Sequence, residues 1–505
     1  MLLALAETLA IIAIVILLSY YVKYFYIAVI ITQVVCVLSI IGRSDNPDYK
    51  VPWLFVVLVL PVVGFMLYFM FYSRKLNSRQ IKRLRQIANQ SVVYNDEDSL
   101  RQLYGTDKTA AGQAAYLLSS SRTHVYNNQN VIYFKSGENM YKSMLADLQN
   151  AQKFIFLEYF IIQKGVFWNS ILDILKQKVK QGVEVRVVYD DIGCMTTLPS
   201  LYYKTLQKYG IKAVPFAILK GDATGEFNNR SHRKIMVIDG VVGYTGGINI
   251  ADEYINERIR FGHWKDGGIK ITGRPVQELT NLFLTDYEFN NRKQLETFAP
   301  YFEASSEPCL ADNNSAHAES QNDGFVVPFG DGPVPIYEQN VAKTAFLNII
   351  NQAQTSVQIT TPYLIIDNEL ANALENAAGR GVNVQIITPH VPDKKFIQLM
   401  SRSYYPRLIK RGVKIYEYLP GFIHAKTIVG DNKYAIVGTI NLDYRSFVHH
   451  FEDGVWMFGC SAINDITCDI TKTLGLCKQI SMADCRQGVI KRFICSIMRI
   501  FAPLL

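Results

Sequence analysis

The sequence predicts an α/β protein built from two duplicated domains and preceded by transmembrane helices at the N-terminus. Three observations support this fold class: apolar stretches gathered in the first 72 residues, β-branched runs that alternate with amphipathic segments, and an internal repeat of about 200 residues. Hydrophobic residues make up 49% of the 505-residue chain and charged residues 19%, which excludes disordered and collagen-like classes. Eight cysteines without a CxxC pair do not indicate a disulfide framework or a zinc site.

Residues 1–72 are expected to form a transmembrane region of two or three spans. The apolar stretches cover residues 2–22, 24–41 and 51–72, each close to the roughly 20 residues that cross a hydrocarbon core. A tight turn at residues 20–26 is expected between the first two. A signal peptide is disfavoured because no basic region and no small-residue cleavage site precede Lys23. Pro61 and Gly64 predict a kink in the third span.

Residues 73–129 are predicted to be a basic juxtamembrane connector. Between residues 74 and 85 the chain carries six basic residues and no acidic one: Arg74, Lys75, Arg79, Lys82, Arg83 and Arg85. Basic residues beside a span favour the cytoplasmic side of the membrane. The sequence therefore predicts a multi-pass membrane protein whose later domains lie in the cytoplasm.

The internal repeat defines two domains, at residues 130–302 and 333–484. The segment that begins at Ala151 parallels the one at Ala353, and the segment at Tyr202 parallels the one at Tyr404. Residues 303–332 contain no Lys or Arg and are rich in Asn, Ser and Asp, so they are expected to form a polar linker. The repeat is too long for a solenoid unit and indicates a duplicated domain.

Both copies carry the same motif of a histidine, a lysine, an aspartate and a later asparagine. These residues are His232, Lys234, Asp239 and Asn249 in the first copy, and His424, Lys426, Asp431 and Asn441 in the second. Residues two apart in an extended segment share a face, so each histidine projects together with its lysine. Turn signals at the two aspartates predict β-hairpins that the aspartates anchor.

A pair of such motifs suits phosphodiester chemistry. One imidazole attacks phosphorus and forms a phosphohistidine, while the other protonates the departing alkoxide and later acts as a base. The lysines and asparagines would hold the non-bridging oxygens. This division of labour requires no metal ion and no other cofactor. Recurrence of the motif at equivalent places in both copies disfavours a purely structural role for the histidines.

The paired HxKxxxxD motifs, with GGxN and GTxN after them, resemble the phospholipase D superfamily. The third apolar stretch and its basic exit resemble bacterial cardiolipin synthases, and the likeness covers nearly the whole chain apart from the first span and the linker. The resemblance implies two domains, each a mixed sheet flanked by helices, related by a pseudo-twofold axis around one active site. It also implies that two phosphatidylglycerols are joined into cardiolipin with release of glycerol, at the bacterial cytoplasmic membrane.

The resemblance further implies roles for individual residues. His232 is expected to be the nucleophile and His424 the acid and base, although the near-symmetry of the motifs leaves this order open. Family members use a downstream acid to orient the catalytic imidazole, and Glu452 stands where that acid is expected. The first copy has Arg260 at the equivalent separation and offers Asp266 instead.

The main departure from the family pattern is Thr439, which stands in place of the second glycine of the GG pair. Its hydroxyl or N–H group is expected to be able to face phosphate.

The main rival function is a membrane-tethered phospholipase D-type phosphodiesterase or nuclease with water as the acceptor. A net charge of +8 suits DNA as well as anionic lipid. However, the basic excess lies at residues 74–85 and at the C-terminus, whereas the linker is acidic. This distribution favours the membrane and its phosphatidylglycerol as partners over nucleic acid. A non-catalytic scaffold is disfavoured because both motifs are intact, and the acceptor alcohol and the oligomeric state stay open.

Residues 485–505 are expected to form an amphipathic, basic C-terminal segment. It carries four basic residues and no acidic one: Arg486, Lys491, Arg492 and Arg499. Its apolar residues follow helical spacing and form one stripe. Two interpretations stay open, a last core helix of the second domain and an interfacial helix on an anionic bilayer.

Overall fold

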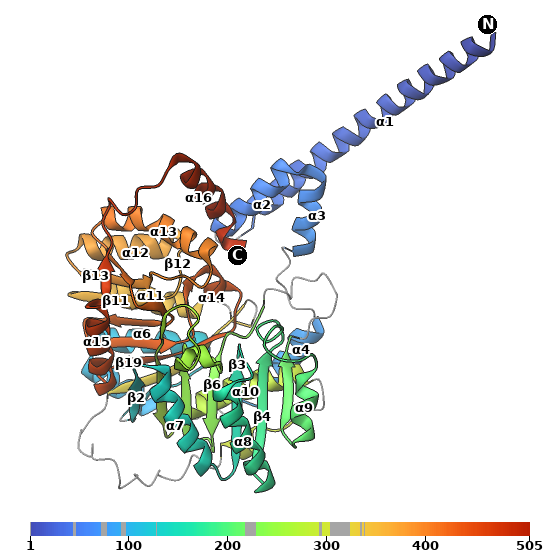
Figure 1. Cartoon of the computed structure of the whole chain (residues 1–505). Coiled ribbons are helices and arrows are strands. Elements are labelled where there is room, and N and C mark those ends of the chain that lie inside the picture. The colour runs from blue at the N-terminus through green and yellow to red at the C-terminus, as the bar shows by residue number, and fades with distance from the viewer. Residues whose placement is uncertain are drawn as a thin grey trace. The chain divides into compact units, whose positions relative to one another are not determined.

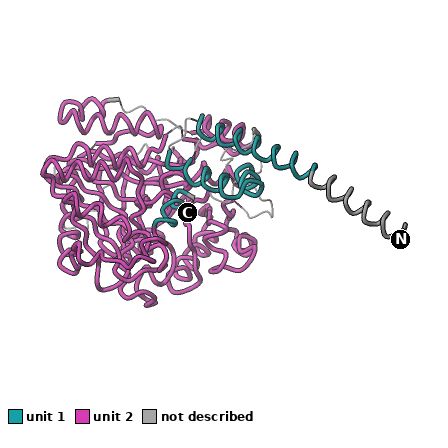
Figure 2. Tube along the Cα trace, turned by 90° about the horizontal axis from the view of Figure 1, so that it is seen from above, with its two compact units in different colours: residues 1–74, 223–225, 496–505 teal, residues 75–222, 226–495 magenta. Residues whose placement is uncertain are grey.

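The computed structural model describes residues 2–43, 47–71, 78–91, 97–127, 129–217, 229–291, 295–302, 324–333, 336–337 and 339–504. In the N-terminal helix, side chains are described from residue 20 onward. The chain forms two compact units (Figure 2). One comprises residues 1–74, 223–225 and 496–505, and the other residues 75–222 and 226–495.

Three helices make up most of the first unit: α1 (Leu2–Ile41), α2 (Pro47–Val59) and α3 (Pro61–Phe71). The prediction of a turn at residues 20–26 is wrong, because α1 continues through this segment. The tyrosines there are compatible with a helix, and neither Gly nor Pro interrupts it. The third apolar stretch breaks at Leu60, which confirms the predicted kink. At Gly64 of α3, a Cβ would lie 2.3 Å from the carbonyl oxygen of Val56 in α2. Only glycine therefore allows the backbones of the two helices to approach this closely.

Among the described residues, the segment Tyr20–Ile41 of α1 is long and apolar enough to cross a membrane, with a mean hydropathy of 2.4. The break at Leu60 leaves α2 and α3 with 13 and 11 residues, each shorter than the roughly 20 residues that a helix needs to span a bilayer. Their apolar side chains pack with those of α1 around Cys36, Trp53 and Tyr68.

The first copy of the repeat forms a seven-stranded sheet in the order β2-β9-β7-β6-β3-β4-β5. The strands are β2 (Val131–Phe134), β3 (Phe154–Tyr159), β4 (Glu184–Asp190), β5 (Lys212–Phe216), β6 (Lys234–Ile238), β7 (Val242–Gly246) and β9 (Gly268–Thr272). Strands β3, β4 and β5 are parallel, and the other neighbours are antiparallel. The sheet is therefore mixed.

The second copy forms a nine-stranded sheet in the order β1-β10-β19-β17-β16-β11-β13-β14-β20. The strands are β1 (Tyr126–Asn127), β10 (Phe325–Asp331), β11 (Ser356–Thr360), β13 (Asn383–Pro389), β14 (Lys414–Tyr418), β16 (Thr427–Gly430), β17 (Tyr434–Gly438), β19 (Glu452–Phe458) and β20 (Cys477–Gln479). From β10 to β14 the order and directions repeat those of the first sheet. The duplication predicted from the sequence is confirmed.

Helices cover both sheets (Figure 1). Those of the first copy are α7 (Gly137–Asn150), α8 (Val166–Lys180), α9 (Tyr202–Lys208) and α10 (Val276–Asn291), and those of the second are α11 (Val341–Gln352), α12 (Asn368–Gly379), α13 (Lys395–Lys410), α14 (Tyr444–Val448) and α15 (Ser461–Leu474). A central core joins α10 and α15 to residues of both sheets, among them Val237 and Val437. In it Phe283 of α10 stacks on Phe156 at 4.6 Å, so we estimate that Phe283→Ala costs about 3–5 kcal/mol.

Two segments differ from the expected domain organisation. The connector contains α4 (Ser78–Ala88), α5 (Glu97–Thr106) and α6 (Lys108–Ser121), and Leu103 and Leu117 are buried in the core of the second copy. Strand β10 lies inside the expected linker, where Pro328 and the polar residues before it hide the strand pattern, and it pairs with β19 along its whole length. Residues 303–323 lie outside the described residues, and the other expected boundaries stay predictions.

The C-terminal segment contains α16 (Val489–Phe501). Its apolar residues Val489, Ile490 and Phe493 are exposed by 82%, 76% and 66%. At the end of the helix, the ring of Phe501 contacts that of Phe55 in α2 within the first unit, at 5.7 Å between centroids. The apolar stripe predicted from the sequence is therefore mostly uncovered, which argues against a last core helix.

Candidate active site

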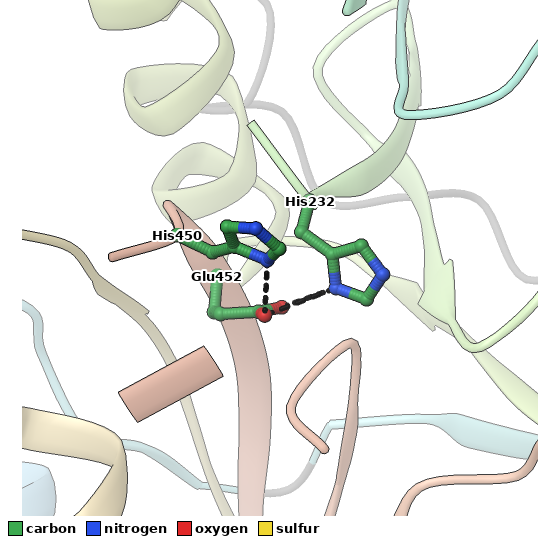
Figure 3. Close-up of side chains that lie close together, drawn as sticks. All are labelled: His232, His450 and Glu452. Atoms are coloured by element: carbon green, nitrogen blue, oxygen red, sulfur yellow. Dashed lines mark hydrogen bonds and ion pairs between the residues drawn. The ribbon is translucent and has the colours of Figure 1, made fainter. Parts of the chain in front are cut away.

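His232 lies just before β6, where backbone bonds hold it against the second copy. Ser231 forms a parallel bridge with Phe451, and His232 N–H donates to the carbonyl of Phe451 at 2.8 Å. This pairing brings Glu452, the first residue of β19, beside the imidazole. The Nδ1 atom of His232 lies 2.9 Å from Oε2 and 3.0 Å from Oε1 of Glu452 (Figure 3).

His424 is held in the same way by the first copy. Strand β15 (Gly421–Ile423) pairs in parallel with β8 (His263–Lys265), and His424 N–H donates to the carbonyl of Lys265 at 2.7 Å. The Nδ1 atom of His424 then meets Oδ2 of Asp266 at 2.7 Å. Each histidine is therefore paired with the carboxylate of the other copy. We call Glu452 and Asp266 the crossed carboxylates.

The two carboxylates occupy equivalent places, although they follow their motifs at different separations. Gly246 of β7 pairs with Gly268, and Gly438 of β17 pairs with Gly454, so each carboxylate lies two residues before the paired glycine. Arg260, which has the separation of Glu452 in sequence, lies elsewhere and forms an ion pair with Glu253 at 3.3 Å. A longer segment before β8 accounts for the difference between the copies.

The two lysines are buried beside their histidines. Lys234 Nζ donates to the carbonyl of His232 at 2.5 Å, and Lys426 Nζ donates to that of His424. Burial lowers the pKa of Lys234 from 10.5 to about 8. Burial, together with the charge of Lys234, lowers the pKa of Lys426 to about 7. The charges of each motif act on the other, in keeping with the crossed contacts of His232 with Glu452 and His424 with Asp266.

Both imidazoles are neutral near pH 7. Burial, followed by the charges of Lys234, Lys426 and His424, lowers the pKa of His232 well below its usual value. Burial and Lys426 lower the pKa of His424 to about 4, although Asp266 opposes the shift. A neutral imidazole that donates its Nδ1 proton to a carboxylate keeps the Nε2 lone pair free. The site thus offers two oriented bases.

The residues that follow the motifs differ between the copies. Asn249 is held by Ile161 N–H at 3.0 Å and donates to the hydroxyl of Tyr254 at 2.7 Å. Asn441 Oδ1, in contrast, is buried without a hydrogen-bond partner. The Asn441 amide is therefore less constrained than that of Asn249.

The second glycine of the GG pair is a steric requirement in the first copy. A Cβ at Gly247 would lie 2.0 Å from Oδ1 of Asp266. At the equivalent place in the second copy, the Thr439 hydroxyl donates to Oε2 of Glu452 at 2.5 Å. The expectation that this hydroxyl faces phosphate is therefore wrong, since it supports a carboxylate instead.

The motif aspartates lie at the opposite ends of their strands from the histidines. Asp239 accepts backbone N–H groups from residues 152–154 at 2.7–2.8 Å, and Asp431 accepts those of residues 354–356 at 2.7–2.9 Å. Both have positive φ, of 53° and 52°. They anchor the hairpins to β3 and β11, the antiparallel neighbours of β6 and β16, and the structure does not bring them to the imidazoles.

Two residues of the site, His450 and Arg233, were not predicted from the sequence. His450 is buried, with its ring 5.3 Å from that of His232; it precedes β19, which begins at Glu452, so strand alternation does not identify it. Arg233, which lies between His232 and Lys234 in the sequence, is buried and donates to Oδ2 of Asp286 at 2.8 Å and to the carbonyl of Glu452 at 3.2 Å. Nothing in the local sequence distinguishes Arg233 from a surface arginine.

Comparisons with known proteins agree with this geometry. Residues 144–259 and 346–472 match the family described as "Cardiolipin synthase, PLD-like domain", and residues 27–71 match "Phospholipase_D-nuclease N-terminal". The chain is 39% identical to an uncharacterized protein of Streptococcus mutans, covering 93% of this chain and 99% of the relative.

Two further relatives carry the name cardiolipin synthase. That of Halalkalibacterium halodurans is 32% identical and that of Alkalihalophilus pseudofirmus 34%, each covering 95% of this chain and 94% of the relative. Among solved structures, phosphatidylserine synthase of Haemophilus influenzae shares the fold, with a TM-score of 0.57 and 16% identity over 79% of this chain and 98% of that one. The chain therefore belongs to the family of phospholipase D-like cardiolipin synthases and is an enzyme of the phosphatidyltransferase class.

Proposed function

We propose that this enzyme makes cardiolipin from two phosphatidylglycerol molecules, with release of glycerol and through a phosphohistidine intermediate. The observation that carries the proposal is the pair of imidazoles, each held by a carboxylate of the other copy in one buried site. Such a pair supplies one nucleophile and one proton donor on opposite sides of a phosphorus atom. The relatives named cardiolipin synthase support the choice of substrate.

In the first step, the Nε2 lone pair of His232 attacks the phosphorus of one phosphatidylglycerol. The P–O bond to the glycerol headgroup breaks, and His424, once protonated, gives its Nε2 proton to the departing oxygen. The phosphate anion of the substrate stabilises the protonated form of His424, because opposite charges nearby raise an imidazole pKa. Lys234 and Lys426 stabilise the charge on the non-bridging oxygens.

In the second step, His424 acts as a base. It removes a proton from the glycerol hydroxyl of a second phosphatidylglycerol, and the alkoxide attacks the phosphorus. The P–N bond breaks, the electron pair returns to Nε2 of His232, and cardiolipin leaves. Each histidine ends in the state in which it began, so the cycle consumes no other reactant.

We assign the nucleophile to His232 on the asymmetry of the two pairs. Both oxygens of Glu452 lie within 3.0 Å of Nδ1 of His232, whereas one oxygen of Asp266 contacts His424. A phosphorylated imidazole that keeps its Nδ1 proton is cationic, and a carboxylate at this place stabilises it. Thr439 further holds Glu452 by donating its hydroxyl proton to Oε2.

We also propose that the enzyme is a protein of the bacterial cytoplasmic membrane, with its catalytic unit on the cytoplasmic side. The apolar segment Tyr20–Ile41 and the six basic residues between positions 74 and 85 support this orientation. In α16, the exposed Ile490 and Phe493 and the basic residues around them suit an anionic bilayer surface. A substrate that never leaves the bilayer requires such an attachment.

Reconstitution of the purified full chain in vesicles of phosphatidylglycerol tests the reaction. We expect cardiolipin and free glycerol in equal amounts, identified by mass spectrometry and an enzymatic glycerol assay. Phosphatidic acid and glycerol without cardiolipin would identify water as the acceptor and contradict the proposal. A second arm with added phosphatidylethanolamine measures whether that lipid replaces the second phosphatidylglycerol.

A further inference from the structure

His232, His450 and Glu452 form a compact group of side chains that we call the His–His–Glu cluster. All three are buried, with 7%, 7% and 0% of each residue exposed. Their ligand atoms lie within 4.8 Å of one another. In Figure 3 both imidazoles turn a nitrogen toward the same carboxylate, which lies between them. The arrangement is that of three donors around one point.

One atom of the cluster has no hydrogen-bond partner. Nδ1 of His450 lies 3.6 Å from Oε1 of Glu452, beyond hydrogen-bond distance, and it has no other partner although it is buried. Buried polar atoms in native proteins nearly always have a partner. This nitrogen faces the Glu452 carboxylate, which also contacts His232. A cation bound among the three side chains would give the nitrogen a partner.

We propose that the His–His–Glu cluster is a binding site for a divalent transition metal ion such as Zn²⁺. Two imidazole nitrogens and one carboxylate oxygen suit Zn²⁺, Co²⁺ or Ni²⁺, whereas Mg²⁺ and Ca²⁺ prefer oxygen ligands throughout. Ligand atoms about 2.0–2.1 Å from a tetrahedral zinc ion lie about 3.3 Å apart. Oε1 of Glu452 lies 3.0 Å from Nδ1 of His232 and 3.6 Å from Nδ1 of His450, and these two distances bracket this value.

The metal would act as an inhibitor, a consequence that rests on the proposed function. A neutral imidazole carries one proton, and His232 uses Nδ1 to hold it against Glu452. When a metal ion takes the Nδ1 lone pair, that proton must reside on Nε2. The nitrogen that attacks phosphorus then has no lone pair, and the reaction stops at its first step. Lys234 and Lys426 repel a cation, so we expect micromolar rather than tighter binding.

Binding is tested on the full-length protein, freed of metal with a chelator and titrated with Co²⁺. Tetrahedral Co²⁺ absorbs strongly in the visible region, so we expect one absorbing site per chain that Zn²⁺ displaces. His450→Asn should raise the apparent dissociation constant at least about tenfold, since even outer-shell changes cost that much. His390→Asn is the matched control, because His390 also pairs with a glutamate, Glu417 at 2.8 Å, outside the site.

The activity arm uses cardiolipin formation with and without Zn²⁺, each variant being compared with its own metal-free rate. We expect Zn²⁺ to inhibit the wild type and His390→Asn, EDTA to restore both, and His450→Asn to need at least about ten times more Zn²⁺. Circular dichroism verifies that His450→Asn is folded, and His450→Gln replaces it if it is not.

Absence of Co²⁺ absorption in the wild type, or unchanged Co²⁺ binding by the His450 variants, would overturn the proposed site. Tight Co²⁺ binding in a protein that makes no cardiolipin would uphold the site and contradict the proposed function instead. Co²⁺ binding without inhibition would overturn the inhibitory role while the site remains.

Discussion

At the scale of single residues, the two imidazoles are neutral and oriented before any substrate arrives. Nδ1 of each faces a carboxylate, and burial keeps both unprotonated near pH 7. The site also contains two lysines with lowered pKa values. It therefore carries less positive charge than two histidines and two lysines with ordinary pKa values would. An anionic phosphate that binds here would therefore also favour the protonated, positively charged forms of these groups.

Removal of either histidine is expected to abolish turnover. Because the proposed mechanism uses one imidazole to attack and the other to transfer the proton, His232→Ala and His424→Ala should each lower the rate of cardiolipin formation at least roughly a thousandfold. Enzyme quenched in alkaline denaturant, in which a P–N bond survives, should carry the phosphatidyl group on one of the two residues only. His390→Ala, outside the site, serves as the control. Near-normal turnover in either variant would contradict a single site that uses both motifs.

The lysines are expected to set the alkaline limb of the pH profile. With pKa values of about 7 and about 8, Lys426 and then Lys234 lose their positive charge as pH rises. Amines hold phosphate oxygens less well than ammonium groups, so kcat/KM, which reports the free enzyme, should fall from pH 7 to 9. Lys426→Arg, whose guanidinium stays charged, should move this limb upward. A profile that stays level to pH 9 would contradict the assignment.

At the scale of elements, much of the site follows from sequence patterns and some of it does not. The hairpins around Asp239 and Asp431 were predictable because HxK places two side chains on one face and the aspartates mark turns. Strand β10 was not, since Pro328 and the polar segment before it dominate the local composition. The continuity of α1 through residues 20–26 was also missed, because clustered tyrosines favour a membrane interface as readily as helix.

The aspartates of the hairpins are expected to contribute to stability rather than to chemistry. Asp431→Ala removes the acceptor of three backbone N–H groups at a partly exposed turn, which we estimate to cost about 1–2 kcal/mol. Asp431→Asn, which keeps one oxygen and tolerates positive φ, should cost less. Chemical unfolding measures both, and kcat per folded molecule should stay within about twofold of the wild type. A large loss of kcat in folded Asp431→Asn would instead indicate contact with substrate.

Helix α16 is expected to be needed for work at a bilayer and dispensable for folding. Truncation after Asp484 removes four basic residues that would each contribute about 1 kcal/mol at an anionic surface. The truncated enzyme should be folded, at least about tenfold slower on vesicles, and partly restored on short-chain phosphatidylglycerol in detergent.

A matched variant, Ile490→Ser with Phe493→Ser, keeps the helix and the contact between Phe501 and Phe55 while removing two exposed apolar side chains. It should behave like the truncation on vesicles. Aggregation of the truncated protein would support a core helix, and full activity on vesicles would exclude the surface role.

At the scale of the whole molecule, neither copy contains a complete catalytic pair. Glu452 and Asp266 were both predictable as candidate acids, but the exchange between copies was not, because the two carboxylates are equivalent by symmetry and sequence order does not reveal which imidazole each one meets. His450 and Arg233 were missed because their neighbours in the site, His232 for His450 and Asp286 for Arg233, are far away in the chain.

A substrate with a good leaving group is expected to separate the two crossed pairs. Phosphatidyl-p-nitrophenol needs no acid in the first step, so Asp266→Asn, which disturbs His424, should still release a burst of nitrophenolate. Glu452→Gln, which disturbs the nucleophile His232, should not. On phosphatidylglycerol both variants should lose at least about a hundredfold in kcat with little change in KM or melting temperature. The opposite pattern of bursts would reverse the assignment of nucleophile and acid.

The exchange of carboxylates also has a consequence during protein synthesis. His232 leaves the ribosome 220 residues before Glu452, the group that orients it. At about 5–20 residues per second, this interval lasts roughly 10–45 s. Until His424 is made, 192 residues after His232, the proposed nucleophile has no second imidazole, and for the whole interval it has no Glu452 carboxylate. Under the proposed mechanism, the order of translation would thus keep the site incomplete until β19, nearly the last strand, has begun.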